Sequence, residues 1–574
     1  MRSIDMKSKI IGVSIATMMM LSASEHNSST ATVGASGAGD SIFALEGNGG
    51  IDVEHYALSI QWDDKSGIID ANASLDIKST QRLSRFNLDF HDLNISSLSI
   101  DGKACSYSRD GDELIITLPS VIESGSSFGL EVLYSGKPTA VKDAITSGWG
   151  SVKAGVEAVS EPISSKNWFP CNNYPKDKAT YSINITVPKA YDVVSNGTPS
   201  EPTLDGDKKT FRFQTREPMS SYLAMVAIGH YDIEKLQTKG GIPIYNYFYK
   251  GMKEELKKPF VNEAKIIDFF AERFGKYPFA SAGIVATDGE SILAYETQTR
   301  SLFGTPTNER MVAHEIAHQW FGDFVSLSDW RESWLKEGFA TYSSALWFEH
   351  TQGKKAMDAW VKGNFESLMG IQMLPKVGLG KLLKVFETKE KMIKAKDIET
   401  LINLGTNNKT NPTEMKAALA LVPADGISNF NLDEVFSKVS FESFRLTFGK
   451  YVTFMNILDE KVSNDRPFEE IVSALAEAPE SVKSMAQMYS PGVYVRGALA
   501  MHALRIKVGD EKFFAILKAY FKRFGNSHAG SKEFTQLAKE VSGEDLDSFF
   551  KAWLEDKLIP DIPEYGLFKK NYSK

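Results

Sequence analysis

The first part of the chain is marked by alternation between apolar and polar residues. The period of two is clearest at residues 56–60, 75–77, 98–100 and 181–187. Alternation of this kind is typical of strands that bury one face. Asp-Gly and Asn-Gly pairs, which favour tight turns between strands, stand at 101–102, 110–111 and 196–197. Residues 51–238 are therefore expected to form an N-terminal antiparallel β domain.

Beyond residue 238 the spacing changes to the three- and four-residue period of helices. A short strand-like stretch comes first, at residues 242–249. Helical spacing follows at 257–273, around 314–318 and at 329–349, and returns at 498–505, 511–524 and 546–553. This order of elements predicts a second domain of α/β build, with a first part at 239–365 and a C-terminal helical part at 480–574. The expected fold class is thus multidomain α+β.

Length and composition fit a folded protein with more than one core. The 574 residues suffice for two or three domains. Hydrophobic residues make up 42% and charged residues 24% of the chain, as in ordinary soluble globular proteins. The formal net charge is −8, and there is no basic stripe with interleaved aromatic residues. These features argue against a nucleic-acid partner.

The N-terminus has the pattern of a secretory signal peptide over residues 1–23. Its basic residues are Arg2, Lys7 and Lys9. An apolar run follows and ends in small residues, with Ala23 at the expected cleavage position. At about fourteen residues the run is short for a membrane span, although an uncleaved membrane anchor stays open. Residues 24–50, rich in Ser, Gly, Ala and Thr, are expected to be a flexible linker. We therefore expect a secreted or periplasmic protein, and whether Cys105 and Cys171 pair in it stays open.

Candidate chemistry is concentrated at residues 314–318, which read His-Glu-Ile-Ala-His. On a helix His314 and His318 lie one turn apart, so both imidazoles can reach a single ion. Glu337, after eighteen intervening residues, can supply a third ligand from a second helix. Two histidines and one glutamate leave the fourth position of Zn²⁺ open for water, as in catalytic sites. Glu315 is then placed to take a proton from that water. The sequence predicts one catalytic zinc ion per chain.

The alternative for this motif is a surface helix with two solvated histidines. Its flanks are apolar, however, and include Met311, Val312, Ile316, Ala317, Trp320, Phe321 and Phe324. Residues 330–342 place Glu337 in a similarly apolar stretch. Helices of this kind are buried, and buried histidine and glutamate side chains need partners. The flanks therefore favour the metal site.

With the zinc triad placed, the chain resembles the zinc aminopeptidases of the aminopeptidase N family (gluzincins), in particular their short bacterial secreted branch. The resemblance covers residues 51–365 and 480–562. In the N-terminal part it is carried by Asn-Trp-Phe-Pro-Cys-Asn at 167–172 and Pro-Lys-Asp-Lys-Ala-Thr-Tyr at 175–181. It implies a saddle-shaped N-terminal β domain and a catalytic domain of thermolysin-like α/β build.

Two further motifs concern the substrate's amino group. Residues 293–300 read Leu-Ala-Tyr-Glu-Thr-Gln-Thr-Arg and are similar to the family's Gly-Ala-Met-Glu-Asn segment, of which only Ala-x-Glu remains. The resemblance implies that Glu296 binds the free α-ammonium of a peptide. Glu161, nine residues before Pro170, stands where relatives have a Gln or Glu that shares this task. A carboxylate near the metal pairs with a peptide N-terminus and so limits cleavage to the first bond.

A tyrosine motif lies in the C-terminal part. Residues 494–498 read Tyr-Val-Arg-Gly-Ala and resemble the family's Tyr-x-x-Gly-Ala segment. The resemblance implies that Tyr494 donates a hydrogen bond to the oxyanion of the tetrahedral intermediate. Tyr489, just upstream, is the alternative donor.

The chain departs from the family pattern in three ways. His314 and Tyr494 are 180 positions apart, more than in relatives, and the excess at 366–479 is expected to be a helical insertion or lid. Its lysine-rich start is more typical of a solvated face than of a binding patch. Ser344 stands where relatives often carry an acid that supports the zinc ligands. We also expect no long C-terminal helical-repeat domain.

Together these observations predict a zinc aminopeptidase that acts on peptides with a free N-terminus. A zinc endopeptidase or an epoxide hydrolase on the same scaffold are the enzyme alternatives, and a non-catalytic binding module is the third. Glu296 would obstruct a longer chain, which disfavours the endopeptidase. A binding module has no need of the complete set of metal ligands, base and tyrosine.

Overall fold

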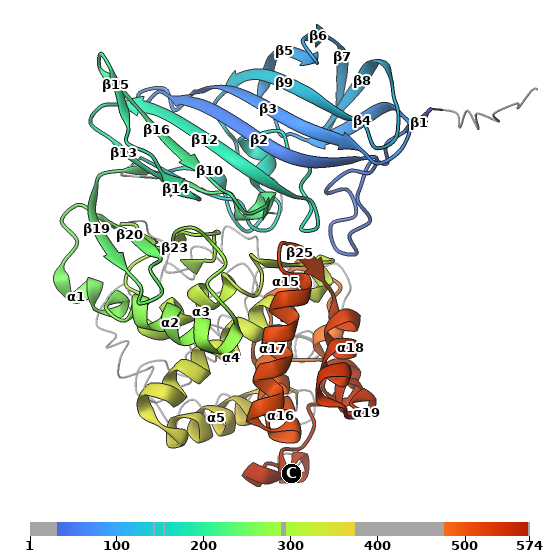
Figure 1. The fold of residues 1–574 in the computed structure, drawn as a ribbon, viewed down its shortest axis with the longest axis vertical. Coiled ribbons are helices and arrows are strands. Elements are labelled where there is room, and N and C mark those ends of the chain that lie inside the picture. Colours follow the sequence, from blue (N-terminus) through green and yellow to red (C-terminus); the bar gives the residue numbers. More distant parts are fainter. Residues whose placement is uncertain (1–30, 142–143, 153–154, 289–293, 373–475, 572–574) are drawn as a thin grey trace, which may run out of the picture.

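A computed structural model describes residues 31–141, 144–152, 155–288, 294–372 and 476–571 (Figure 1). The expected signal peptide, the first part of the expected linker and nearly all of the expected insertion at 366–479 lie outside these residues. In the part of the chain that is described, no helix combines the length and apolar character needed to cross a membrane.

The N-terminal domain is built around a ten-stranded sheet with the main order β14-β16-β12-β2-β3-β9-β5-β6. Its strands are β2 (Ile51–Trp62), β3 (Ile69–Ser79), β5 (Asn94–Ile100), β6 (Lys103–Ala104), β9 (Ser127–Gly136), β12 (Lys178–Pro188), β14 (Thr198–Pro199) and β16 (Lys208–Gln214), with β15 (Thr203–Asp205) beside β16 and β17 (Met219–Ser220) beside β12. The four alternating segments lie in β2, β3, β5 and β12, which confirms them as strands.

Two smaller sheets complete this domain. The first has the order β1-β4-β8-β7 and consists of β1 (Thr32–Val33), β4 (Leu83–Asp89), β7 (Ser106–Asp110) and β8 (Glu113–Ile122). The second has the order β10-β11-β18-β13 and consists of β10 (Gly148–Val152), β11 (Gly155–Val159), β13 (Asp192–Ser195) and β18 (Val226–Gly229). The Asp-Gly and Asn-Gly pairs lie at turns, where Gly102, Gly111 and Gly197 have positive φ angles.

The N-terminal domain is mainly antiparallel, as expected, but the centre of its large sheet is an exception. There β12 pairs with β2 in parallel, with Tyr181 opposite Tyr56. The rings of these two tyrosines stack with their centroids 4.9 Å apart. Alternation reports which face of a strand is buried but not the direction of its neighbour. The long connection between β2 and β12, which forms several other strands, lets β12 enter from the same end as β2.

The expectation of a flexible linker is wrong for residues 31–50. Asp40, Glu46 and Asn48 in this segment are buried. The Asp40 carboxylate accepts a hydrogen bond from the Trp330 backbone N–H in the second domain (2.8 Å), and Glu46 forms an ion pair with Lys166. A Gly- and Ser-rich composition predicts flexibility only where polar groups stay in water. Here the polar side chains have partners in both domains.

The second domain begins with a five-stranded sheet in the order β19-β20-β21-β23-β22. Its strands are β19 (Tyr231–Gln237), β20 (Pro243–Tyr249), β21 (Ile284–Ala286), β22 (Ala294–Tyr295) and β23 (Ser301–Phe303). The strand-like stretch at 242–249 corresponds to β20. However, β19 pairs with β20, so this sheet starts before the expected boundary at residue 239. Alternation alone does not tell to which sheet a strand belongs.

Most of the other described residues of the second domain are helical (Figure 1). These helices are α1 (Glu254–Lys257), α2 (Glu263–Phe274), α3 (Glu309–His318), α4 (Trp334–Gln352), α5 (Lys354–Gln372), α15 (Met485–Met488), α16 (Gly497–Val508), α17 (Asp510–Phe524), α18 (Ser531–Ser542) and α19 (Asp547–Phe550). The expected helix at 257–273 is interrupted near Pro259, which cannot continue a helix interior. Strands β24 (Val325–Leu327) and β25 (Ser527–Ala529) pair in parallel and join the two parts of the domain.

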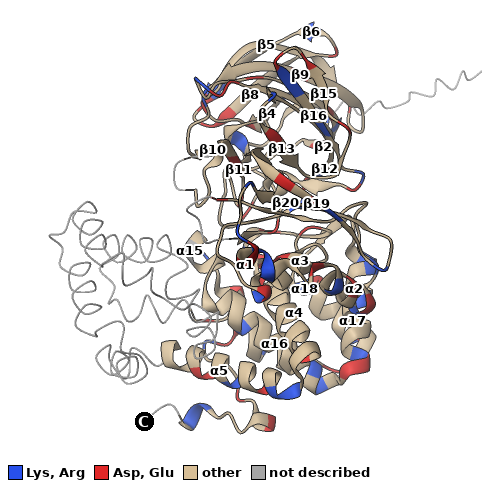
Figure 2. Cartoon of the chain, turned by 90° about the vertical axis from the view of Figure 1, so that its left-hand side faces the viewer, with Lys and Arg blue, Asp and Glu red and all other residues tan. Residues whose placement is uncertain are grey.

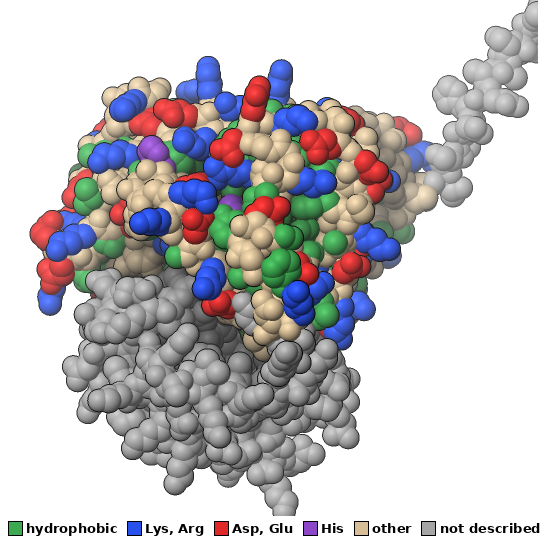
Figure 3. All heavy atoms as spheres, turned by 90° about the horizontal axis from the view of Figure 1, so that it is seen from below, with side chains coloured by type: hydrophobic (Ala, Val, Ile, Leu, Met, Phe, Trp, Pro, Cys, Tyr) green, Lys and Arg blue, Asp and Glu red, His purple; other side chains and the backbone are tan. Residues whose placement is uncertain are grey.

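Partly buried hydrogen bonds connect the two domains next to α3. Lys178 in β12 donates to the carbonyl oxygens of Asp323 (2.7 Å) and Phe324 (2.9 Å). The Tyr174 hydroxyl donates to the carbonyl oxygen of Ser328 (3.0 Å). Acidic and basic positions alternate along the ribbon in Figure 2, and acidic and basic side chains of the described residues are interspersed on the face shown in Figure 3.

Candidate active site

The histidine motif lies on α3, which is buried over most of its length. Asn308 caps this helix, and its side chain accepts a hydrogen bond from the Met311 backbone N–H (3.0 Å). Every residue from 311 to 318 is buried. The neighbouring helix α4 is buried from its start through Trp347. This explains why apolar residues cover most of the circumference of both helices.

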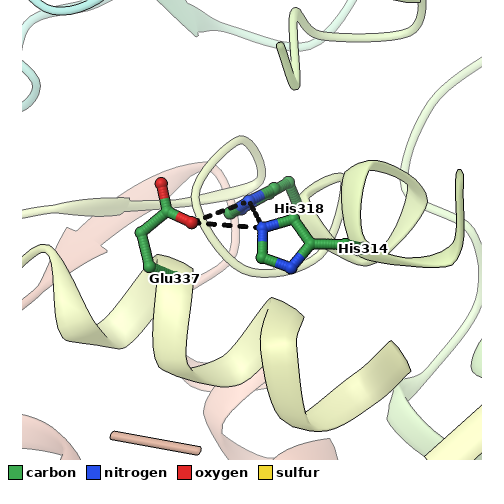
Figure 4. A group of neighbouring side chains, drawn as sticks. All are labelled: His314, His318 and Glu337. Carbon is green, nitrogen blue, oxygen red and sulfur yellow. Dashed lines mark hydrogen bonds and ion pairs between the residues drawn. The ribbon is translucent and has the colours of Figure 1, made fainter. Parts of the chain in front are cut away.

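Three side chains from these helices converge on one point (Figure 4). The Nε2 atom of His314 lies 3.1 Å from Oε2 of Glu337 and 3.1 Å from Nε2 of His318. The His318 Nε2 atom lies 3.5 Å from the same Glu337 oxygen. Ligands about 2.0–2.1 Å from a tetrahedral zinc ion are roughly 3.3 Å from one another. The three atoms therefore have the separations that a single Zn²⁺ ion requires.

The surroundings of the histidines also fit a metal. The Nδ1 atom of His318 lies 3.1 Å from the Phe321 carbonyl oxygen, which can only accept, so Nδ1 carries the proton and Nε2 presents a lone pair. Two Nε2 atoms that face each other at 3.1 Å need a proton or a metal ion between them. The Nδ1 atom of His314 faces the Thr341 hydroxyl at 3.4 Å. Ser344, which stands where relatives often carry an acid, does not take this place, because its hydroxyl donates to the Thr341 carbonyl oxygen (2.8 Å). The side chain that faces the Nδ1 atom of His314 is therefore a neutral threonine.

Glu315 lies on the same side of α3 as this centre. Its carboxylate oxygen, one of Glu296 and a nitrogen of His318 all lie within 4.8 Å of one another. All three residues are buried. A carboxylate so close to a ligand of the metal can exchange a proton with a water molecule bound there. The structure thus brings the predicted base next to the predicted ligands.

The two predicted amine-binding residues meet although they come from different domains. Glu161 follows β11 in the N-terminal domain, and Glu296 follows β22 in the second domain. Both are buried, and their carboxylates lie within 4.8 Å of that of Glu337. Burial and the charge of Glu296 raise the pKa of Glu161 to about 7. The two carboxylates together form an acidic pocket beside the metal ligands.

Sequence reasoning missed Lys336, which lies at the centre of this pocket. Its ammonium forms ion pairs with Glu161 and Glu296 and lies 3.2 Å from Oε1 of Glu337. Burial by itself would lower the pKa of Lys336. The three carboxylates have the larger, opposite effect and hold this pKa well above its usual range. Burial likewise opposes ionisation of Glu337, yet Lys336 and both histidines hold the pKa of that carboxyl well below normal. A lysine inside an apolar helical segment was the available signal, because it requires buried carboxylate partners.

The predicted tyrosine reaches the site across the long gap in sequence. Tyr494 lies in a turn of π-helix, Gly492–Arg496, that leads into α16. Its ring is parallel to that of His314, with centroids 6.0 Å apart. Tyr489 is also buried, which raises its pKa well above normal, and Glu161 and Lys336 are among its charged neighbours. Tyr494 thus borders the metal ligands, and Tyr489 borders the acidic pocket.

Two glycines allow this approach. A Cβ atom on Gly338 would lie 3.0 Å from the backbone of Gly497, which is tighter than most contacts of a Cβ atom in proteins. Gly338 directly follows Glu337, and Gly497 stands three residues after Tyr494. The backbone contact therefore brings the third metal ligand and the tyrosine together. The cysteines have no part in the site, and both Cys105 and Cys171 are unpaired.

Comparison with known proteins places the chain in a family. Residues 52–223 match the peptidase M1 N-terminal domain, and residues 263–377 and 431–553 match the peptidase family M1 domain. The chain belongs to the M1 peptidase family. These matches include every predicted site residue, from Glu161 to Tyr494.

Curated relatives of this M1 chain carry the names of aminopeptidases. Aminopeptidase M1 of Arabidopsis thaliana is 32% identical over 202 residues, and human glutamyl aminopeptidase is 30% identical over 221 residues. These alignments cover 32% and 35% of the M1 chain but only 23% of either relative. The chain therefore spans about a quarter of the length of the curated relatives that it matches.

Solved structures resemble the M1 chain over nearly its whole length. An M1 zinc metallopeptidase from Deinococcus radiodurans, bound as a mutant to a Tyr-Ser-Ala substrate, aligns with a TM-score of 0.67 at 23% identity. The alignment covers 92% of this chain and 99% of the other. At this identity the likeness confirms the two-domain fold, with a mainly β domain followed by a catalytic domain rich in helices.

Proposed function

We propose that this M1 family member is a zinc-dependent aminopeptidase that hydrolyses the N-terminal peptide bond of peptides. The observation that carries the proposal is the position of two buried carboxylates, Glu161 and Glu296, directly beside a His-His-Glu metal site. A substrate held there by its α-ammonium has only its first peptide bond near the metal. The names of the curated relatives point to the same activity.

His314, His318 and Glu337 would hold the zinc ion. A bound zinc ion supplies Lewis-acid chemistry at the first peptide carbonyl and makes water a better nucleophile at neutral pH. Its three ligands are buried, with side-chain exposures of 5%, 1% and 3%. Burial strengthens the electrostatic effect of every charged group at the centre.

The remaining steps fall to the protein's own side chains. Glu315 accepts a proton from the attacking water and passes it to the leaving amine as the peptide bond breaks. Tyr494 donates a hydrogen bond to the oxygen that becomes negative in the transition state. Glu161 and Glu296 hold the α-ammonium and so keep the first carbonyl in register with these groups.

We further propose that the protein is exported and acts outside the cytoplasm. The basic start and apolar run of residues 1–23 support this proposal. Expression in a bacterial host followed by fractionation would test it, with the mature N-terminus determined by mass spectrometry. Cleavage after Ala23 is expected. A full-length chain in the membrane fraction would indicate an anchor instead, and one in the cytoplasm would refute export.

The activity is tested with a panel of fluorogenic amino-acid amides, each supplied with a free and with an acetylated N-terminus. Truncating one partner of a buried charge pair costs about 2–5 kcal/mol, so acetylation should lower kcat/KM by roughly 30- to 5,000-fold. A chelator should abolish cleavage, and added Zn²⁺ should restore it. Efficient cleavage of acetylated substrates or of internal peptide bonds would favour an endopeptidase and refute the proposal.

A further inference from the structure

The pocket beside the metal site has the donor set of a second cation site. Glu161, Glu296 and Glu337 come from three separate segments, yet their carboxylate oxygens lie within 4.8 Å of one another. Each of these side chains is less than one tenth exposed. Several converging carboxylates are the arrangement by which proteins bind divalent cations, and carboxylates that bridge two metals are common in hydrolases.

In this protein the pocket is filled by an ammonium group. The Lys336 side chain is 1% exposed and contacts all three carboxylates. Its Nζ atom also lies 5.7 Å from the ring centre of Tyr222 and 5.9 Å from that of Trp330. Aromatic faces attract organic cations. The carboxylates and the rings together enclose the ammonium, so it takes the place that a metal ion would need.

Charge matching leads to the same conclusion. When all four are ionised, the carboxylates of Glu161, Glu296, Glu315 and Glu337 carry four negative charges. They face the two positive charges of one zinc ion and the single charge of Lys336. One negative charge remains, which is what the ammonium of one substrate neutralises. Without Lys336 two negative charges remain, the charge of one more divalent ion. This comparison rests on the proposed function, because it assumes the first zinc ion.

We propose that Lys336 is a built-in ammonium that fills a three-carboxylate cation site. It keeps the centre at one metal ion and leaves the outer oxygens of Glu161 and Glu296 for the substrate's amino group. Lys336 is therefore a positioning residue: it contacts the carboxylates of Glu161, Glu296 and Glu337 and acts on the metal and the substrate only through them. Removing it should convert the centre into a two-metal site.

The test is the metal content of Lys336→Ala, measured by mass spectrometry of metals after dialysis against excess Zn²⁺. The substitution opens the space of the missing propylammonium group. We expect one zinc ion per chain in the wild type and two in the variant. Millimolar propylammonium should displace the second ion, and the second equivalent of Zn²⁺ should raise the unfolding temperature of the variant only.

The matched control is Lys166→Ala in the N-terminal domain. Lys166 is also a buried lysine, with 6% exposure, but it pairs with only two carboxylates, those of Glu46 and Asp112. The metal content of the Lys166→Ala variant should stay at one zinc ion per chain. A gain of a metal in this control would show that carboxylates left without their lysine take up zinc in general, and would overturn the specific assignment to Lys336.

A second variant covers the case in which Lys336→Ala does not fold. Lys336→Gln keeps most of the volume, and its amide satisfies part of the carboxylate hydrogen bonding while its oxygen can itself bind a metal. It should also hold two zinc ions. One zinc ion in a folded variant refutes the inference while leaving the proposed function intact. A wild type that binds no zinc, or that cleaves no free amino-acid amide, refutes the proposed function itself.

Discussion

Substitution of Tyr494 by phenylalanine isolates a single hydroxyl group. The phenylalanine ring can keep the parallel packing on His314, at a centroid distance of 6.0 Å. Loss of one oxyanion donor costs about 2.7–4 kcal/mol in the transition state, or roughly 10²–10³-fold in kcat. Tyr494 is buried, so solvent water cannot easily take the place of its hydroxyl. We therefore expect the upper part of this range.

The assay is steady-state hydrolysis of a free amino-acid amide at saturating and at limiting concentrations. The ground-state carbonyl carries little charge, so KM should change much less than kcat. Tyr489→Phe is the matched control, because Tyr489 is similarly buried but borders the acidic pocket. The reasoning is refuted if Tyr494→Phe has the kcat of the wild type. If Tyr489→Phe then shows the large loss, the two tyrosines have exchanged roles.

Three further predictions concern the metal centre and the N-terminal segment. Glu315→Gln should retain zinc but lose turnover by about 10²–10⁴-fold, because the amide cannot accept a proton; full activity in the zinc-loaded variant would exclude Glu315 as the base. His318→Ala and Glu337→Ala should lose bound zinc together with activity, and metal analysis showing one zinc ion per chain in both would remove them from the ligand set. Asp40→Ala removes an acceptor of three backbone hydrogen bonds, at a cost of about 3 kcal/mol. The unfolding temperature of this variant should fall by several degrees. Leu45 lies in the same segment but is 70% exposed, so Leu45→Ala should leave the unfolding temperature unchanged. Equal unfolding temperatures for the two variants would mean that residues 31–50 do not stabilise the fold.

Local patterns of sequence were enough to predict much of this protein. Alternation located β2, β3, β5 and β12, because a strand with one buried face must repeat every two residues. The spacing of His314 and His318 placed both side chains on one face of a buried helix, because α-helical geometry fixes that relation without any distant contact. Glu337 could be added because its apolar surroundings already predicted a second buried helix.

Distant contacts were decided only by the tertiary structure. Three features depend on partners far away in the chain. They are the parallel pairing of β2 with β12, the sheet to which β19 belongs and the fixed conformation of residues 31–50. Lys336 is the clearest case. Its position next to Glu337 is visible in the sequence, but a charge inside a helix acquires meaning only from the groups that surround it. Those groups come from two domains, and burial makes their interaction with the lysine strong enough to shape the site.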